Sequence, residues 1–179
     1  NCSGYHSSNS TILGFSHTHL SGTGAIDYGD ILIVPATGEL QLDPGSEANP
    51  ESGYRSRFRH ETEVATPGYY AVTLDDHGVR AELTTTSRVG FHRYTFPKGS
   101  SPHIIIDLVH GLGDRATETN LNIVGPNKVT GMRRSTGWAK DQYIYFTAEF
   151  SQPFSSFGIS DSSGFIEGKK SGSGAIVKG

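Results

Sequence analysis

Alternation of apolar and polar side chains with a period of two residues is the feature that most constrains how this chain folds. Within Gln142–Phe150, Ile144 and Phe146 share one face of an extended segment, while the two tyrosines of the segment share the other. The same alternation runs through Gly78–Ser87. Because successive side chains of a strand point to opposite faces, this pattern predicts strands that bury one face and expose the other.

Turn signals such as Pro67-Gly68 and Gly125-Pro126 separate these segments at short intervals. Short connections indicate antiparallel neighbours, since a parallel crossover needs about a dozen residues or more. The run HIIIDLVHG (103–111) is apolar on both faces, which is typical of a central strand buried between layers. We therefore predict an all-β fold, an antiparallel β-sandwich, and find no helical periodicity. Further strands are expected at Asp30–Val34, Tyr54–Val64, Tyr69–Leu74, Gly90–Phe96, Asn120–Val124, Lys128–Arg134 and Phe154–Ser160, and a loop at Ser160–Gly174.

Composition supports this fold and excludes several classes of partner. The chain has 179 residues, which fits one domain, and its 23 glycines and 18% charged residues suit a loop-rich β protein. A net charge of −3 gives no electrostatic case for binding nucleic acid or an anionic membrane. No apolar run approaches the roughly 20 residues needed to span a bilayer. Cys2 is the sole cysteine, so the chain holds no internal disulfide and no thiolate metal cluster.

The segment GFSHTHLSGTGAIDYGD (14–30) contains three sets of residues that catalytic sites use. His17 and His19 would point the same way on an extended segment and could ligate a metal, but a third ligand cannot be assigned, and a hydrogen-bonding role is favoured. The glycine run lacks the lysine of a phosphate-binding loop and precedes a strand. Asp27 and Asp30 lie too close in one loop to straddle a glycosidic bond, which favours a role in organising the loop.

Two other acid–imidazole combinations, His60-Glu61 with Glu63 and Asp107 with His110, are weaker. His60 and Glu61 would face opposite sides of a strand, which argues against a catalytic dyad. Asp107 lies within an apolar run, so we expect its carboxylate to be paired with Arg93 or with loop amides. Exposed aromatic rings suit sugar stacking, but most aromatic residues on alternating strands are core. For Trp138 we expect burial in the sandwich over contact with sugar.

Several longer segments resemble glycoside hydrolase family 92, in the order that the family has them. They are GFSHTHLSGTG-x-x-DYGDIL-x-x-P (14–35), RFRHETEVATPGYYAVTL (57–74), AELTTTSRVGFHRYTFP (81–97), IIIDLVH (104–110) and GWAKDQYIYFTAEFSQPF (137–154). The resemblance covers nearly the whole chain. It implies that residues 1–179 are the N-terminal β-sandwich domain of an exo-acting α-mannosidase, packed in the family on an (α/α)₆ catalytic barrel that this chain does not contain.

The resemblance implies a calcium-dependent enzyme that inverts anomeric configuration, with calcium and both catalytic carboxylates held by the barrel. It therefore implies no catalytic and no metal-binding residue in this chain. Its partners would be α-mannoside glycans and its own C-terminal barrel, and its location secreted, periplasmic or at the cell surface. We expect the domain to be truncated at both ends, because a glycine-rich segment and a Trp-Asp pair precede CSGYH (2–6) in the family.

By position, CSGYH and SHTHLSGTG-x-x-D are the loops expected to face the sugar pocket. The candidate residues for binding substrate or the domain interface are His6, His17, His19 and Asp27, near the leaving-sugar subsite. Without the resemblance, the residues leave two alternatives open, an autonomous carbohydrate-binding β-sandwich module and a His-ligated metallohydrolase.

Overall fold

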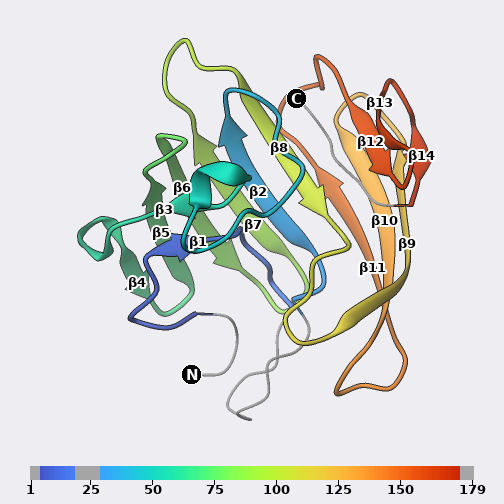
Figure 1. The fold of residues 1–179 in the computed structure, drawn as a ribbon, viewed down its shortest axis with the longest axis horizontal. Coiled ribbons are helices and arrows are strands. Elements are labelled where there is room, and N and C mark those ends of the chain that lie inside the picture. The colour runs from blue at the N-terminus through green and yellow to red at the C-terminus, as the bar shows by residue number, and fades with distance from the viewer. Residues whose placement is uncertain (1–4, 19–28, 174–179) are drawn as a thin grey trace.

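The computed structural model describes residues 5–18 and 29–173, and these are built mainly of β-strands (Figure 1). One four-stranded antiparallel sheet has the order β4 (Val64–Thr66), β5 (Tyr69–Leu74), β6 (Val79–Thr85), β7 (Gly90–Thr95). A second has the order β11 (Gln142–Glu149), β10 (Lys128–Thr136), β9 (Arg115–Ile123), β14 (Ser171–Gly172). Consecutive strands pair within each sheet, as the short turns predict, and the predicted all-β antiparallel sandwich is confirmed.

A two-stranded ribbon, β2 (Leu32–Thr37) with β8 (Pro102–Asp107), lies between the two sheets in Figure 1. Alternate residues of β8 bury on opposite sides. Ile104 and Ile106 pack with residues of the β9–β10–β11 sheet, while Ile105 packs with Leu32 and Val34 of β2. The expectation of a buried strand in the apolar run at 103–111 is therefore confirmed as far as Asp107, whereas the run then leaves the strand and Val109 is exposed.

The remaining elements are short. The strands β1 (Thr11–Ile12) and β3 (Ser56–Arg57) pair with each other, and β12 (Gly158–Asp161) forms a hairpin with β13 (Gly164–Glu167). Two single-turn 3₁₀ helices, η1 (Pro50–Ser52) and η2 (His60–Thr62), lie in connections. Within the described ranges, no helix is long and apolar enough to cross a membrane.

Three sequence-based expectations were wrong. Tyr54–Val64 is not one strand, because the β3 amide of Arg57 donates to the Asp76 carboxylate and the chain then turns through η2. The described part of the expected loop Ser160–Gly174, which ends at Ser173, contains a hairpin, because Ser163 N donates to Asp161 Oδ1 and closes the β12–β13 turn. Trp138 is not buried: it lies in the turn between β10 and β11, where no layer covers it, and is 73% exposed.

Arg133 on β10 occupies the most unusual position in the core, because its guanidinium is fully buried between two carboxylates. Its Nη1 donates to Asp30 Oδ1 (2.8 Å) and to Asp114 Oδ2 (2.5 Å), and its Nε donates to the Leu108 carbonyl oxygen (2.9 Å). The Gln142 amide donates to both oxygens of Asp30 at 2.9 Å. These bonds join β10, β11 and the segments that precede β2 and follow β8.

Removing the Arg133 charge should strongly destabilise the fold. Arg133→Met keeps an unbranched side chain but leaves two buried carboxylates without their cation, so the free energy of unfolding should fall by about 3–5 kcal/mol. Urea unfolding followed by circular dichroism measures this loss. The neighbouring exposed ion pair of Arg134 with Asp141 provides the control, since solvent screens that pair and Arg134→Met should lower the free energy of unfolding far less. Equal losses in both variants would show that the buried cluster is not special.

Candidate functional site

A groove of about 750 Å³ runs between the N-terminal segment and the β4–β5–β6 sheet. Its floor is apolar and includes Phe15, Phe58 and Leu83, which belong to one cluster of the core. Polar groups are found in three places along the groove. A concave, mainly apolar surface with a few convergent polar groups is typical of a ligand-binding site.

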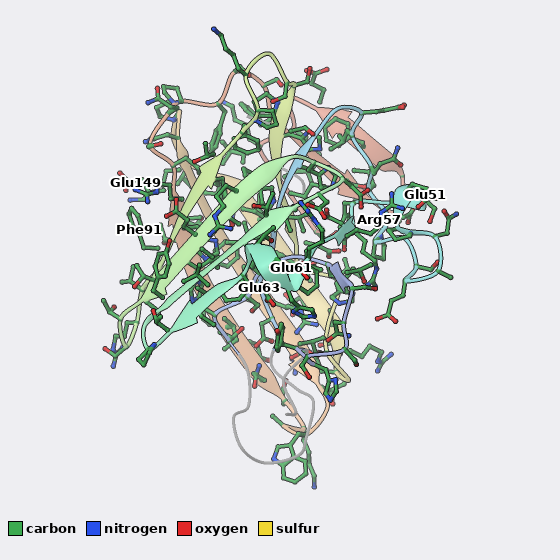
Figure 2. The ribbon with its side chains drawn as sticks, turned by 90° about the vertical axis from the view of Figure 1, so that its left-hand side faces the viewer. Glu51, Arg57, Glu61, Glu63, Phe91 and Glu149 are labelled. Atoms are coloured by element: carbon green, nitrogen blue, oxygen red, sulfur yellow. The ribbon has the colours of Figure 1, made fainter. Side chains whose placement is uncertain are left out.

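The first polar group is centred on Glu63, which follows η2. Figure 2 labels Glu63 beside Glu61. Its carboxylate accepts hydrogen bonds from the Tyr70 hydroxyl (2.5 Å) and the Tyr5 hydroxyl (3.1 Å), and it contacts His60 Nδ1. Burial alone would raise the pKa of Glu63, but the hydrogen bonds from these groups lower it below its ordinary value. Glu63 is therefore ionised at neutral pH and attaches the N-terminal segment to the sheet.

The second polar group is His17, which lines the groove and is connected to two residues of β7 that do not line it. His17 Nε2 contacts His92 Nε2, and His92 Nδ1 contacts the Tyr94 hydroxyl. Gly90 permits this arrangement, because a Cβ at that position would collide with the His17 ring. Burial, and secondarily the charge of His17, lower the pKa of His92 to about 4, so His92 is a neutral hydrogen-bonding group at physiological pH.

The third polar group lies where the groove meets Arg55 and His110. Arg55 Nη1 donates to Thr11 Oγ1 (3.0 Å), but Arg55 Nε and His110 Nε2 are buried and have no hydrogen-bond partner among the described residues. Burial lowers the pKa of His110, and the nearby Arg55 lowers it further. A buried donor without a partner costs free energy, so these atoms are suited to a hydroxyl or carboxylate that another molecule or segment supplies.

The His17 loop is also tied to the buried Arg133 cluster. The Asp30 amide donates to Thr18 Oγ1 (3.1 Å), and Thr18 Oγ1 lies 3.2 Å from Ser16 Oγ. The Asp30 carboxylate accepts hydrogen bonds from the Arg133 guanidinium and the Gln142 amide. Burial raises the pKa of Asp30, and Arg133 opposes that rise. The organising role that the sequence predicts for Asp30 is confirmed, through an ion pair instead of an Asx turn.

The four predicted site residues have different outcomes. His17 lines the groove. His6 contacts Ser8 Oγ through Nδ1 (2.8 Å) and is not among the residues that line the groove. His19 and Asp27 lie outside the described residues. Their assignment to substrate binding or a domain interface stays a prediction, because no geometry of the chain alone tests it.

Reasoning from the sequence did not single out His92 or Arg55, and it weighed Glu63 and His110 only as members of weak acid–imidazole combinations. The period of two in β7 places His92 and Tyr94 on one face, which was a usable signal. No signal in the sequence pairs His17 with His92, because they are 75 positions apart. Asp107 follows the prediction: it accepts the amides of Val109 and His110 (2.7 and 2.9 Å), while Arg93 pairs with Glu82 instead.

A calcium or zinc ion does not fit the described residues. Across 5–18 and 29–173, no group of three or more His, Cys, Asp or Glu side chains is placed to hold a metal. His17 and His92 supply two imidazoles only, and the Glu63 carboxylate is occupied by three donors. Metal chemistry therefore has no centre in the part of the chain that is described.

The structure defines an all-β sandwich domain with an apolar groove, and comparison with known proteins gives its family. The chain belongs to glycosyl hydrolase family 92, as the N-terminal domain, whose family model matches residues 1–179. Among solved structures it is similar to the family GH92 alpha-mannosidase BT3965 from Bacteroides thetaiotaomicron, with 38% identity and a TM-score of 0.88 over 99% of this chain and 25% of that one.

Two further relatives agree. The GH92 family glycosyl hydrolase ccman5 has 25% identity and a TM-score of 0.75, over 98% of this chain and 24% of that one. A protein of Arthroderma benhamiae described as an uncharacterized secreted glycosidase is 31% identical over 116 residues, which is 60% of this chain and 15% of that protein. The chain thus spans about a quarter or less of the length of these relatives.

The His17–His92 contact predicts an unusual titration. His92 should stay neutral until the pH falls to about 4, whereas an ordinary histidine titrates near 6.5. Because the unfolded chain then binds the proton more readily, this residue should make stability fall as pH drops from about 6.5 towards 4. NMR of the imidazole ¹³Cε1–¹H signals measures the pKa of His92.

His17→Ala supplies the matched variant. It removes a neighbouring charge and opens His92 to water, so the pKa of His92 should rise towards its ordinary value. A wild-type His92 that titrates near 6.5 would contradict the burial of this ring.

Proposed function

We propose that this chain is the N-terminal β-sandwich of a secreted, calcium-dependent, inverting exo-α-mannosidase. In this proposal it packs on a C-terminal (α/α)₆ catalytic domain, and its groove forms the leaving-sugar side of the active site for hydrolysis of α-mannosides of N-glycans or mannan. The observation that carries the proposal is the groove with His17 at its wall, in a chain that the family model matches throughout.

The ionisation states of the groove support an accessory role. Inverting hydrolysis needs an acid and a base roughly 6.5–9.5 Å apart, with the acid protonated. Glu63 is ionised and bonded to three donors, and Asp30 is buried against Arg133. Neither carboxylate is placed to donate a proton to a glycosidic oxygen, so the acid and the base would come from the second domain, and the chain alone would be inactive.

The hydrogen-bonding groups at the groove wall support a role in recognising sugar. His17 lines the groove and is connected to His92 and Tyr94 behind it, and Arg55 Nε and His110 Nε2 have no hydrogen-bond partner among the described residues. Sugar hydroxyls both donate and accept, which matches such a mixture. Secretion is supported by the Arthroderma benhamiae relative, which is described as a secreted glycosidase.

The role in binding the leaving sugar can be tested in the full-length protein. His17→Ala should lower kcat/KM for mannobiose by about tenfold, the loss expected for roughly 1.4 kcal/mol of transition-state binding. It should change kcat/KM for an aryl α-mannoside much less, because the aryl leaving group makes no sugar contacts. Lys98→Ala, an exposed change in the β7–β8 turn, is the control. Equal losses on both substrates would show that His17 acts on folding or on the other sugar subsite.

The division of labour between the domains predicts a difference in metal dependence. Chelation should abolish hydrolysis by the full-length protein, and calcium should restore it. The isolated chain should release no mannose, and neither calcium nor a chelator should change its urea midpoint, since the described residues offer no metal site. Binding of stoichiometric calcium by the isolated chain would contradict the proposal.

The second candidate is an autonomous carbohydrate-binding module, which is favoured by the exposed rings of Tyr5 and Tyr69 at the groove. Isothermal titration of the isolated chain with mannobiose separates the two candidates. An affinity that His17→Ala abolishes would favour the module over the accessory role.

A further inference from the structure

We propose that the outer face of the β9–β10–β11 sheet is a second glycan-binding surface, which takes a neutral polysaccharide chain apart from the groove. This inference rests on the proposed function only in the choice of an α-mannan as ligand. The surface, called the tyrosine face below, consists of Tyr143 and Tyr145 of β11, Met132 and Arg134 of β10, and Asn120 and Asn122 of β9.

Strand register places these side chains in rows across the sheet. Tyr145 lies opposite Met132, which in turn lies opposite Asn120. In the next row, Thr147 lies opposite Thr130, which in turn lies opposite Asn122. Aromatic rings therefore occupy one side of the tyrosine face, while amides and hydroxyls occupy the other. A pyranose ring, with C–H bonds on its face and hydroxyls on its rim, needs both kinds of group.

The tyrosines are exposed although their strand is well packed. Tyr145 is 73% exposed and Tyr143 is 45% exposed, while Ile144 and Phe146 of the same strand are turned inward, and Phe146 packs against the core. Tyr143 is held in place by the Arg134 guanidinium, whose Cζ lies 4.9 Å from the ring centroid. Two rings at alternate positions of one strand are about 7 Å apart, which suits successive sugars of a chain better than a single pocket.

The amides are already oriented. Asn122 Nδ2 donates to Asn120 Oδ1 at 2.5 Å, which uses one N–H of Asn122 and the carbonyl oxygen of Asn120. The Asn120 NH₂ group and the Asn122 carbonyl oxygen keep their capacity for a ligand. Fixing side chains before binding reduces the entropy that a ligand must overcome.

The charges favour a neutral ligand. Arg134 donates to both oxygens of Asp141 (2.7 and 3.0 Å), and Lys128 lies 3.8 Å from Glu149 on the neighbouring strand. Arg134 and Lys128 thus each have a carboxylate beside them, which weakens any positive field that could attract a nucleic acid or an anionic lipid. None of the residues of the tyrosine face lines the groove. An open, charge-balanced surface with aromatic rings fits a neutral glycan chain that lies across the strands.

The experiment is affinity electrophoresis of the full-length protein in gels containing soluble α-mannan, with a chelator present to prevent hydrolysis. Wild-type protein should be retarded. Tyr145→Ala should weaken binding by about tenfold or more, as is expected when a central aromatic anchor is removed, and Tyr145→Phe should retain it. Phe91→Ala is the matched control: Phe91 is 65% exposed but belongs to β7 of the other sheet, where Figure 2 shows it at the edge. This control should leave binding unchanged.

The outcomes separate this inference from the proposed function. Retardation of wild type that Tyr145→Ala abolishes, with hydrolysis of mannobiose unchanged, supports the tyrosine face. Equal retardation of wild type and Tyr145→Ala overturns it. Loss of both mannobiose hydrolysis and folding stability in Tyr145→Ala also overturns it, because the face would then be covered by the rest of the protein. A wild type without mannosidase activity would refute the proposed function, while retardation would still test the surface.

Discussion

The ion pair between Arg133 and Asp30 is the interaction on which the rest of the structure depends. The Nε and Nη1 groups of Arg133 have partners in the segments before β2 and after β8, and Asp30 also accepts from Gln142 of β11, whereas Nη2 is buried without a hydrogen-bond partner among the described residues. These segments are distant in the chain. A buried cation is costly unless carboxylates lie beside it, so the pair ties the segments that flank the central ribbon to the second sheet.

This constraint extends to the groove. The Asp30 amide holds Thr18, and His17, which precedes Thr18, contacts His92 on β7. At the other end of the N-terminal segment, the Tyr5 hydroxyl donates a hydrogen bond to the Glu63 carboxylate, which anchors the segment there. The segment is thus attached by polar contacts at both ends, with the apolar residues Ile12 and Phe15 packed between them. A groove wall built this way keeps its hydrogen-bonding groups oriented, which reduces the cost of binding a ligand.

Several carboxylates of this domain are engaged in structural hydrogen bonds. Glu63, Asp30, Asp76 and Glu82 each accept hydrogen bonds from a nearby side chain, and in three of these the partner is an arginine. Hydrogen bonds lower the pKa of Glu63, Asp76 and Glu82, which keeps them ionised at neutral pH. A domain organised in this way can orient a substrate, whereas a glycosidic acid needs a raised pKa.

The sequence alone indicated the family, the all-β class and several of the strands. β5 and β11 were predicted to within a residue because their side chains alternate regularly and their turns contain glycine or proline. It also indicated that the carboxylate of Asp107 is bonded to loop amides. These are local properties, written in neighbouring residues. Only the tertiary structure decided that His17 contacts His92 and that Arg133 is buried between two carboxylates, because these contacts join residues far apart in the chain. The exposure of Trp138 was also decided there, because it depends on how the sheets pack.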